Sequence, residues 1–133
     1  MRRIITLLFV LFALPSQCFS DENVYKAVVG PDGVEHVEIT AGSYFFKPVH
    51  IVVKVNVPVE LTLRSESSII PHNFVLNAPE AGMDVSVSLS REPKTVQVTP
   101  TKAGTYDFYC DRRFLFFRSH RARGMEGKLE VVD

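Results

Sequence analysis

Strict alternation of apolar and polar side chains is the feature that most constrains how this chain can fold. Such alternation is typical of β-strands that bury one face and expose the other to solvent. It occurs in seven segments that turn residues separate: 34–40, 49–57, 59–64, 85–90, 95–99, 105–110 and 128–131. Strands with one buried and one wet face are typical of antiparallel sheets, so we expect mainly antiparallel pairing.

No long stretch of the chain has a helical period, and 133 residues leave room for one ordinary domain. Seven or eight short strands in about 110 residues favour an all-β Greek-key β-sandwich. The segment 77–84 contains Pro79 and Gly82 and is expected to be a loop between strands.

The first residues have the pattern of a secretory leader. Arg2 and Arg3 precede an apolar run over 4–14, which is shorter than the roughly 20 residues of a membrane-spanning helix. We expect residues 1–20 to be a signal peptide and 21–133 to be a single domain. The protein would then be periplasmic or secreted, without stable membrane insertion after cleavage. Lipidation at Cys18 and a retained anchor are the alternatives.

The composition is that of a globular protein, with 46% hydrophobic residues and 15 basic against 15 acidic residues. This balance excludes a general polyanion binder, and no nucleic acid partner is expected. Removal of residues 1–20 would leave Cys110 as the single cysteine in an oxidising compartment. An unpaired thiol in that setting needs protection or a use.

Four residues form a soft candidate ligand set: His72, Cys110, His120 and Met125. Taken alone, each fits an ordinary role, such as a turn histidine, a buried core thiol or a core methionine. Together, two imidazoles, a thiolate and a weak axial thioether are the ligands of blue-copper electron-transfer sites. Zinc is disfavoured because a thioether is a poor zinc ligand.

Three motifs, 71–74, 103–110 and 124–131, resemble those of the cupredoxins, the type 1 copper proteins. The resemblance implies one copper ion that cycles between Cu(I) and Cu(II). His72, Cys110 and His120 would be its strong ligands, with Met125 as the axial ligand. Asn73 and Asp111 would hold the ligand loops together by hydrogen bonding.

The loop between Cys110 and His120 is unusually long for a small blue cupredoxin, because nine residues intervene. A loop of this length is more similar to the type 1 sites of copper nitrite reductases. Its apolar run 114–117 lies between arginines, which leaves two interpretations open. Two of the aromatics pack back on the sandwich, or the loop is a partner-docking surface formed by Arg112, Arg113, Phe114, Phe117 and Arg118.

The resemblance implies an electron carrier between redox protein partners, with the His120 imidazole as the electron exit. The arginine-rich loop favours a partner with an acidic docking patch. The main alternative is a periplasmic copper-binding protein for copper tolerance or delivery. An enzyme is not expected, and no catalytic residue is assigned. Tyr109 and Asp111 flank Cys110, where multicopper enzymes have a histidine that leads to a second copper.

The remaining histidines and several carboxylates are expected to be ordinary surface groups. His36 and His50 fall on the polar phase of their segments, which favours solvated residues over a second metal site. The same interpretation is given to four glutamates: Glu35, Glu38, Glu60 and Glu66.

Overall fold

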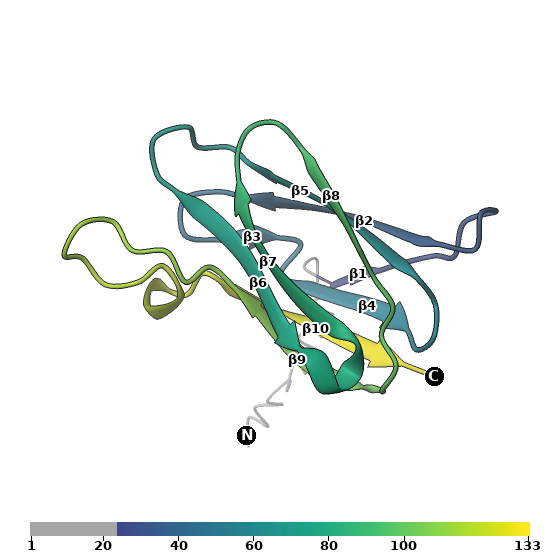
Figure 1. The fold of residues 1–133 in the computed structure, drawn as a ribbon. Helices are drawn as coiled ribbons and strands as arrows, with labels where there is room; N and C mark the ends of the chain where they lie inside the picture. Colours follow the sequence, from purple (N-terminus) through teal and green to yellow (C-terminus); the bar gives the residue numbers. More distant parts are fainter. Residues whose placement is uncertain (1–23) are drawn as a thin grey trace, which may run out of the picture.

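The computed structural model describes residues 24–133, so the predicted leader and Cys18 lie outside the described residues. Ten strands form two sheets that pack as a sandwich (Figure 1). The first sheet has the order β1 (Val24–Lys26), β4 (His50–Lys54), β10 (Glu126–Val132), β9 (Gly104–Tyr109), β6 (His72–Ala78) and β7 (Met83–Leu89). The second has the order β3 (Phe46–Lys47), β2 (Glu35–Ala41), β5 (Val59–Ser65) and β8 (Lys94–Val98). The predicted all-β Greek-key sandwich is confirmed.

The core lies between the sheets and follows the alternation of the sequence. In β5, for example, Val59, Leu61 and Leu63 are buried, whereas the side chains between them are not. Phe74 of β6 stacks on Phe108 of β9 with ring centroids 5.2 Å apart. The first sheet is thereby packed tightly on the side that faces the second sheet.

All seven predicted segments contain a strand, but β1, β3 and β6 were not predicted. The omission of β6 matters most, because this strand begins at a candidate ligand. Its first five residues are all buried, so both of its faces are covered and it shows no alternation. The expected loop over 77–84 does connect two strands but is shorter than predicted, because β6 extends to Ala78 and β7 begins at Met83, with the 3-10 turn Pro79–Ala81 between them.

The pairing is mainly antiparallel, as expected, but three of the eight strand pairs are parallel. Strands β1 and β4, β4 and β10, and β2 and β5 run parallel, whereas the other pairs are antiparallel. Between β2 and β5 the chain passes through β4, which belongs to the opposite sheet. Because the chain crosses between sheets, it can return to its first sheet in the same direction.

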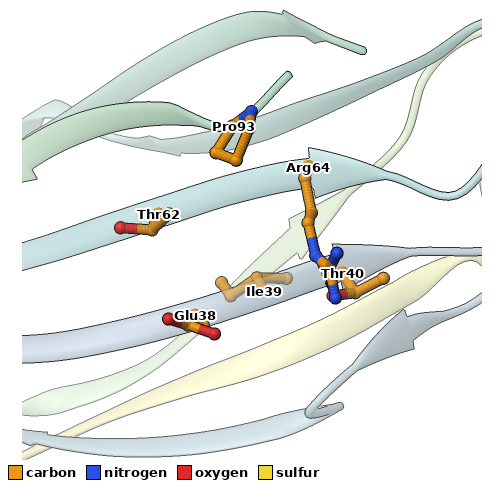
Figure 2. A pocket seen from close by; sticks show the side chains of 6 residues that line it. All are labelled: Glu38, Ile39, Thr40, Thr62, Arg64 and Pro93. Atoms are coloured by element: carbon orange, nitrogen blue, oxygen red, sulfur yellow. Dashed lines mark hydrogen bonds between the residues drawn. The ribbon is translucent and has the colours of Figure 1, made fainter. Parts of the chain in front are cut away.

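The outer face of the second sheet is polar and carries a shallow pocket. Figure 2 shows the side chains around it, with Arg64 close to Thr40, whose Oγ1 accepts a hydrogen bond from Arg64 Nε at 3.3 Å. The pocket holds none of the four candidate ligands, and its lining residues are Glu38, Ile39, Thr40, Thr62, Arg64 and Pro93. Within residues 24–133, no helix has the length and apolarity that crossing a bilayer requires.

The two histidines expected at the surface are there. His36 is exposed and lies between Asp32 and Glu60, with nitrogen–oxygen distances of 2.7 and 3.1 Å. Hydrogen bonds to these carboxylates raise the pKa of His36 above its ordinary value. His50 is partly exposed, and its Nε2 lies 2.8 Å from Glu130. Among the described residues, neither belongs to a cluster that could hold a metal ion.

Glu35 differs from the expectation, because it is fully buried rather than a surface charge. It shares the inward phase of β2 with Val37 and Ile39. Its Oε2 accepts a hydrogen bond from the backbone N–H of Lys54 at 3.0 Å, which links β2 to β4 in the opposite sheet. A buried carboxylate in this position is a structural tie between the sheets.

Glu35→Ala should lower the free energy of unfolding by about 1–3 kcal/mol, because the Lys54 N–H then loses its buried acceptor. Glu35→Gln keeps an acceptor oxygen and should cost less. Glu38→Ala, on the wet face of the same strand, should stay within about 0.5 kcal/mol of the wild type. Urea unfolding of the three variants measures this order, and equal losses at both positions would contradict the assigned role.

Candidate metal centre

The pairing of β6 with β9 brings two candidate ligands together from distant parts of the chain. The strands are antiparallel, with Val75 opposite Tyr109 and Leu76 opposite Phe108. The start of β6 therefore lies at the same end of the sheet as the end of β9. His72 is the first residue of β6, and Cys110 directly follows β9. The two side chains meet there although 38 residues separate them.

His120 completes a compact triangle of ligand atoms. Cys110 Sγ lies 4.0 Å from His72 Nδ1 and 3.4 Å from His120 Nδ1, and the two Nδ1 atoms are 3.2 Å apart. A point equally far from the three atoms lies about 2.1 Å from each, close to the roughly 2.0–2.3 Å of imidazole and thiolate bonds to zinc. The donor set and its spacing therefore fit a first-row transition-metal ion.

Burial sets the protonation of all three side chains, which are at most 2% exposed. Burial and the neighbouring His120 lower the pKa of His72 to about 4. Burial and then Arg123 lower the pKa of His120. Both imidazoles are therefore neutral near pH 7, as a metal ligand requires. Burial raises the pKa of the Cys110 thiol, so a bound cation would have to displace its proton.

Asn73 and Asp111 form the link that the resemblance implies. Asn73 Nδ2 donates to Asp111 Oδ1 at 2.7 Å, and the Asp111 N–H donates to Asn73 Oδ1 at 3.0 Å. The Asn73 N–H also points at Cys110 Sγ, 3.4 Å away. The Asn73 side chain thus ties the two candidate ligand segments together, and its backbone N–H places a donor on the sulfur.

Met125 is fully buried, and its backbone is hydrogen-bonded to Cys110 and His120. Its N–H donates to the carbonyl of His120 at 3.0 Å, and its own carbonyl accepts from the Cys110 N–H at 3.1 Å. The residue therefore sits between the segments of two candidate ligands, which is compatible with the axial role expected for it.

Two backbone hydrogen bonds close the long loop at its base. The positions of the candidate ligands therefore do not depend on how long the loop is. The N–H of His120 donates to the carbonyl of Arg112 at 2.8 Å, and the N–H of Arg121 donates to the carbonyl of Cys110 at 2.9 Å. The residues between project from one end of the sandwich (Figure 1). None of the apolar side chains of 114–117 is buried, so two aromatics do not pack back on the sandwich.

His120, the expected electron exit, does not itself reach the surface. Its ring is 1% exposed, and the half-buried Tyr44 packs edge-on against it with centroids 5.0 Å apart. Arg123 lies over the Tyr44 ring at 4.6 Å. No sequence pattern singled out Tyr44 as a neighbour of His120, because this contact joins loops that are far apart in the chain.

Comparisons with known proteins agree with the fold. A family model described as a cupredoxin-like domain matches residues 4–127. Plastocyanin from Lactuca sativa is 40% identical over 70 residues, which are 46% of this chain and 64% of that protein. Plastocyanin A'/A'' from Nicotiana tabacum matches to the same extent. This chain thus spans less than two thirds of the length of these relatives.

Solved structures with the same fold are more distant in sequence. Auracyanin A from Chloroflexus aurantiacus has a TM-score of 0.57 at 21% identity, covering 75% of this chain and all of that one. The metal-binding domain of the Cu(I)-exporting P-type ATPase CopA from Streptococcus pneumoniae has a TM-score of 0.61 at 19% identity, covering 83% and 96%. The family match over most of the sequence, and the shared fold, lead to one conclusion: this chain belongs to the cupredoxin-like family.

Proposed function

We propose that this protein is an exported carrier of single electrons that binds one copper ion between His72, Cys110, His120 and Met125. The observation that supports it is the buried triangle of two imidazole nitrogens and one thiol sulfur. The similarity to plastocyanins and to auracyanin A, a "blue" copper protein, supports this proposal. The leader pattern of residues 1–20 supports export to the periplasm or beyond.

Copper would supply a one-electron couple between Cu(I) and Cu(II) when bound. The contribution of the chain is to hold its donor atoms in one arrangement for both oxidation states. His72 is fixed at the start of a buried strand, and the Asn73–Asp111 pair fixes Cys110 relative to it. Packing against Tyr44 restricts the His120 ring. Such rigidity would keep the rearrangement of the donor atoms small when the copper ion gains or loses an electron.

Electron exchange with the partner would pass from His120 through the covering Tyr44 ring. The ligand ring is buried, and the half-buried tyrosine lies against it. The arginines around this end of the molecule favour a redox protein with an acidic docking patch.

No chemical transformation of a substrate is assigned, and the protein is proposed not to be an enzyme.

Copper handling, for tolerance or delivery, is the second candidate. The full burial of His120 favours it, because a buried ligand shields a cargo ion better than it passes electrons. Affinities for Cu(I) and Cu(II) separate the two functions. A carrier holds both ions tightly, whereas a delivery protein holds one much more weakly and releases it to an acceptor.

Cys110→Ser should abolish the intense visible absorption of the copper-loaded protein, because that band needs a sulfur-to-copper charge transfer. Absorption and EPR spectra of the loaded protein measure this. His50→Ala removes an imidazole outside the triangle and should leave the spectra unchanged. A visible band that persists in Cys110→Ser would exclude the proposed site.

Met125→Leu should keep the copper but raise its reduction potential by tens of millivolts or more. Loss of the weak thioether donor disfavours Cu(II), the harder ion, more than Cu(I). Met83→Leu makes the same change at another fully buried methionine, at the start of β7, and should leave the potential unaltered. Electrochemical titration measures the reduction potentials of the wild type and both variants. A lower or unchanged potential in Met125→Leu would rule out an axial role.

Changing Arg112, Arg113 and Arg118 together to Ser should flatten the salt dependence of electron transfer to an acidic acceptor. Exposed charges are screened over about 8 Å at physiological salt, so the wild-type rate should fall as salt rises. Stopped-flow oxidation across a salt series measures both slopes. A matched control removes three exposed lysines elsewhere and should keep the wild-type slope: Lys26, Lys54 and Lys102. A wild-type slope in the arginine variant would mean that these arginines do not steer the partner.

A further inference from the structure

The long loop ends in an apolar tip that is exposed throughout. Phe114, Leu115, Phe116 and Phe117 are 39%, 69%, 87% and 44% exposed, and they are consecutive. Exposure is greatest at the two central residues, so the tip presents apolar surface away from the protein body. Contiguous exposed apolar groups of this kind mark an interaction site.

The tip is a formed turn rather than an open strand of chain. The N–H of Phe117 donates to the carbonyl of Phe114 at 3.1 Å, and their rings stack with centroids 6.4 Å apart. Leu115, the first central residue of this turn, has a φ of 52°. Glycine is the favoured residue for such a conformation, and a bulky residue there is strained. The sequence thus places a leucine at the tip at a cost in backbone energy, which indicates a use for its side chain.

Arginines without acidic partners flank the tip. Among residues 24–133, neither Arg113 nor Arg118 forms an ion pair. Arg112 donates to the hydroxyl of Ser88 at 2.7 Å rather than to a carboxylate. The one acidic residue of the loop, Asp111, is already bound by Asn73. The base of the tip is therefore cationic, with guanidinium groups available to an anionic partner.

We propose that this tip docks the protein on an anionic lipid bilayer. Phenylalanine and leucine side chains flanked by arginine suit the boundary between headgroups and acyl chains, where arginine meets lipid phosphate. A protruding tip can enter a bilayer, whereas a flat protein interface would leave most of its apolar surface uncovered. This proposal goes beyond electron transfer, does not depend on copper, and would turn the ligand end of the molecule toward the membrane.

The test is co-sedimentation of the mature protein with vesicles of phosphatidylcholine and phosphatidylglycerol in equal parts. Binding is expected at low salt and should weaken at high salt, with much weaker binding to phosphatidylcholine alone. Leu115→Ser with Phe116→Ser, and separately Arg113→Ser with Arg118→Ser, should each lower the affinity by about tenfold or more. Both pairs are exposed, so the fold should persist.

Matched controls make the result specific to the loop. Val28→Ser removes an exposed apolar side chain from the loop between β1 and β2, and Lys102→Ser removes an exposed charge; neither should alter binding. Cys110→Ser should bind like the wild type, so failure of the copper proposal leaves this one standing. Absence of binding to the anionic vesicles would overturn it, as would equal losses in the controls. A tip variant that slows transfer to a protein acceptor, without any vesicle binding, would assign the tip to protein docking instead.

Discussion

The antiparallel register between β6 and β9 is the constraint on which the whole site depends. It brings the start of one strand and the end of the other to the same edge, so that His72 and Cys110 meet across 38 residues of chain. A slip of one residue would turn every side chain of β6 to the opposite face. Asn73 and Asp111 secure this register with two hydrogen bonds directly beside the sulfur. The hydrogen bonds between β6 and β9 thus set the relative positions of these two candidate ligands.

Much of the sandwich could be predicted from alternation, because half-buried strands show their burial in the sequence. The strand that matters most could not, because β6 is covered on both faces and its sequence, HNFVLNA, shows no alternation of apolar and polar residues. Glu35 illustrates the converse error. Its charge suggested the surface, whereas its phase with Val37 and Ile39 indicated the core, and the phase proved the better guide.

The candidate ligands could be identified from residue type, since few chains combine two histidines, a cysteine and a methionine in this order. The structure brings three of them into contact distance, and it buries the fourth, Met125, whose backbone is hydrogen-bonded to Cys110 and His120. The cover of the site was not predictable. Tyr44 adopts a positive φ of 64° and reaches His120 only because the chain after β2 turns back over the end of the sandwich. Contacts of this kind follow from tertiary packing and leave no periodic signal.

The two backbone hydrogen bonds at the base of the long loop separate the task of holding the candidate ligands from the task of presenting a surface for recognition. Residues 113–119 can change in number and in composition while the backbone bonds of His120 to Arg112 and of Arg121 to Cys110 remain. Sequence changes in this loop could therefore alter what the protein docks on without altering the geometry of the candidate ligands. For the same reason, the segment is a natural site for grafting a foreign recognition sequence onto a cupredoxin scaffold.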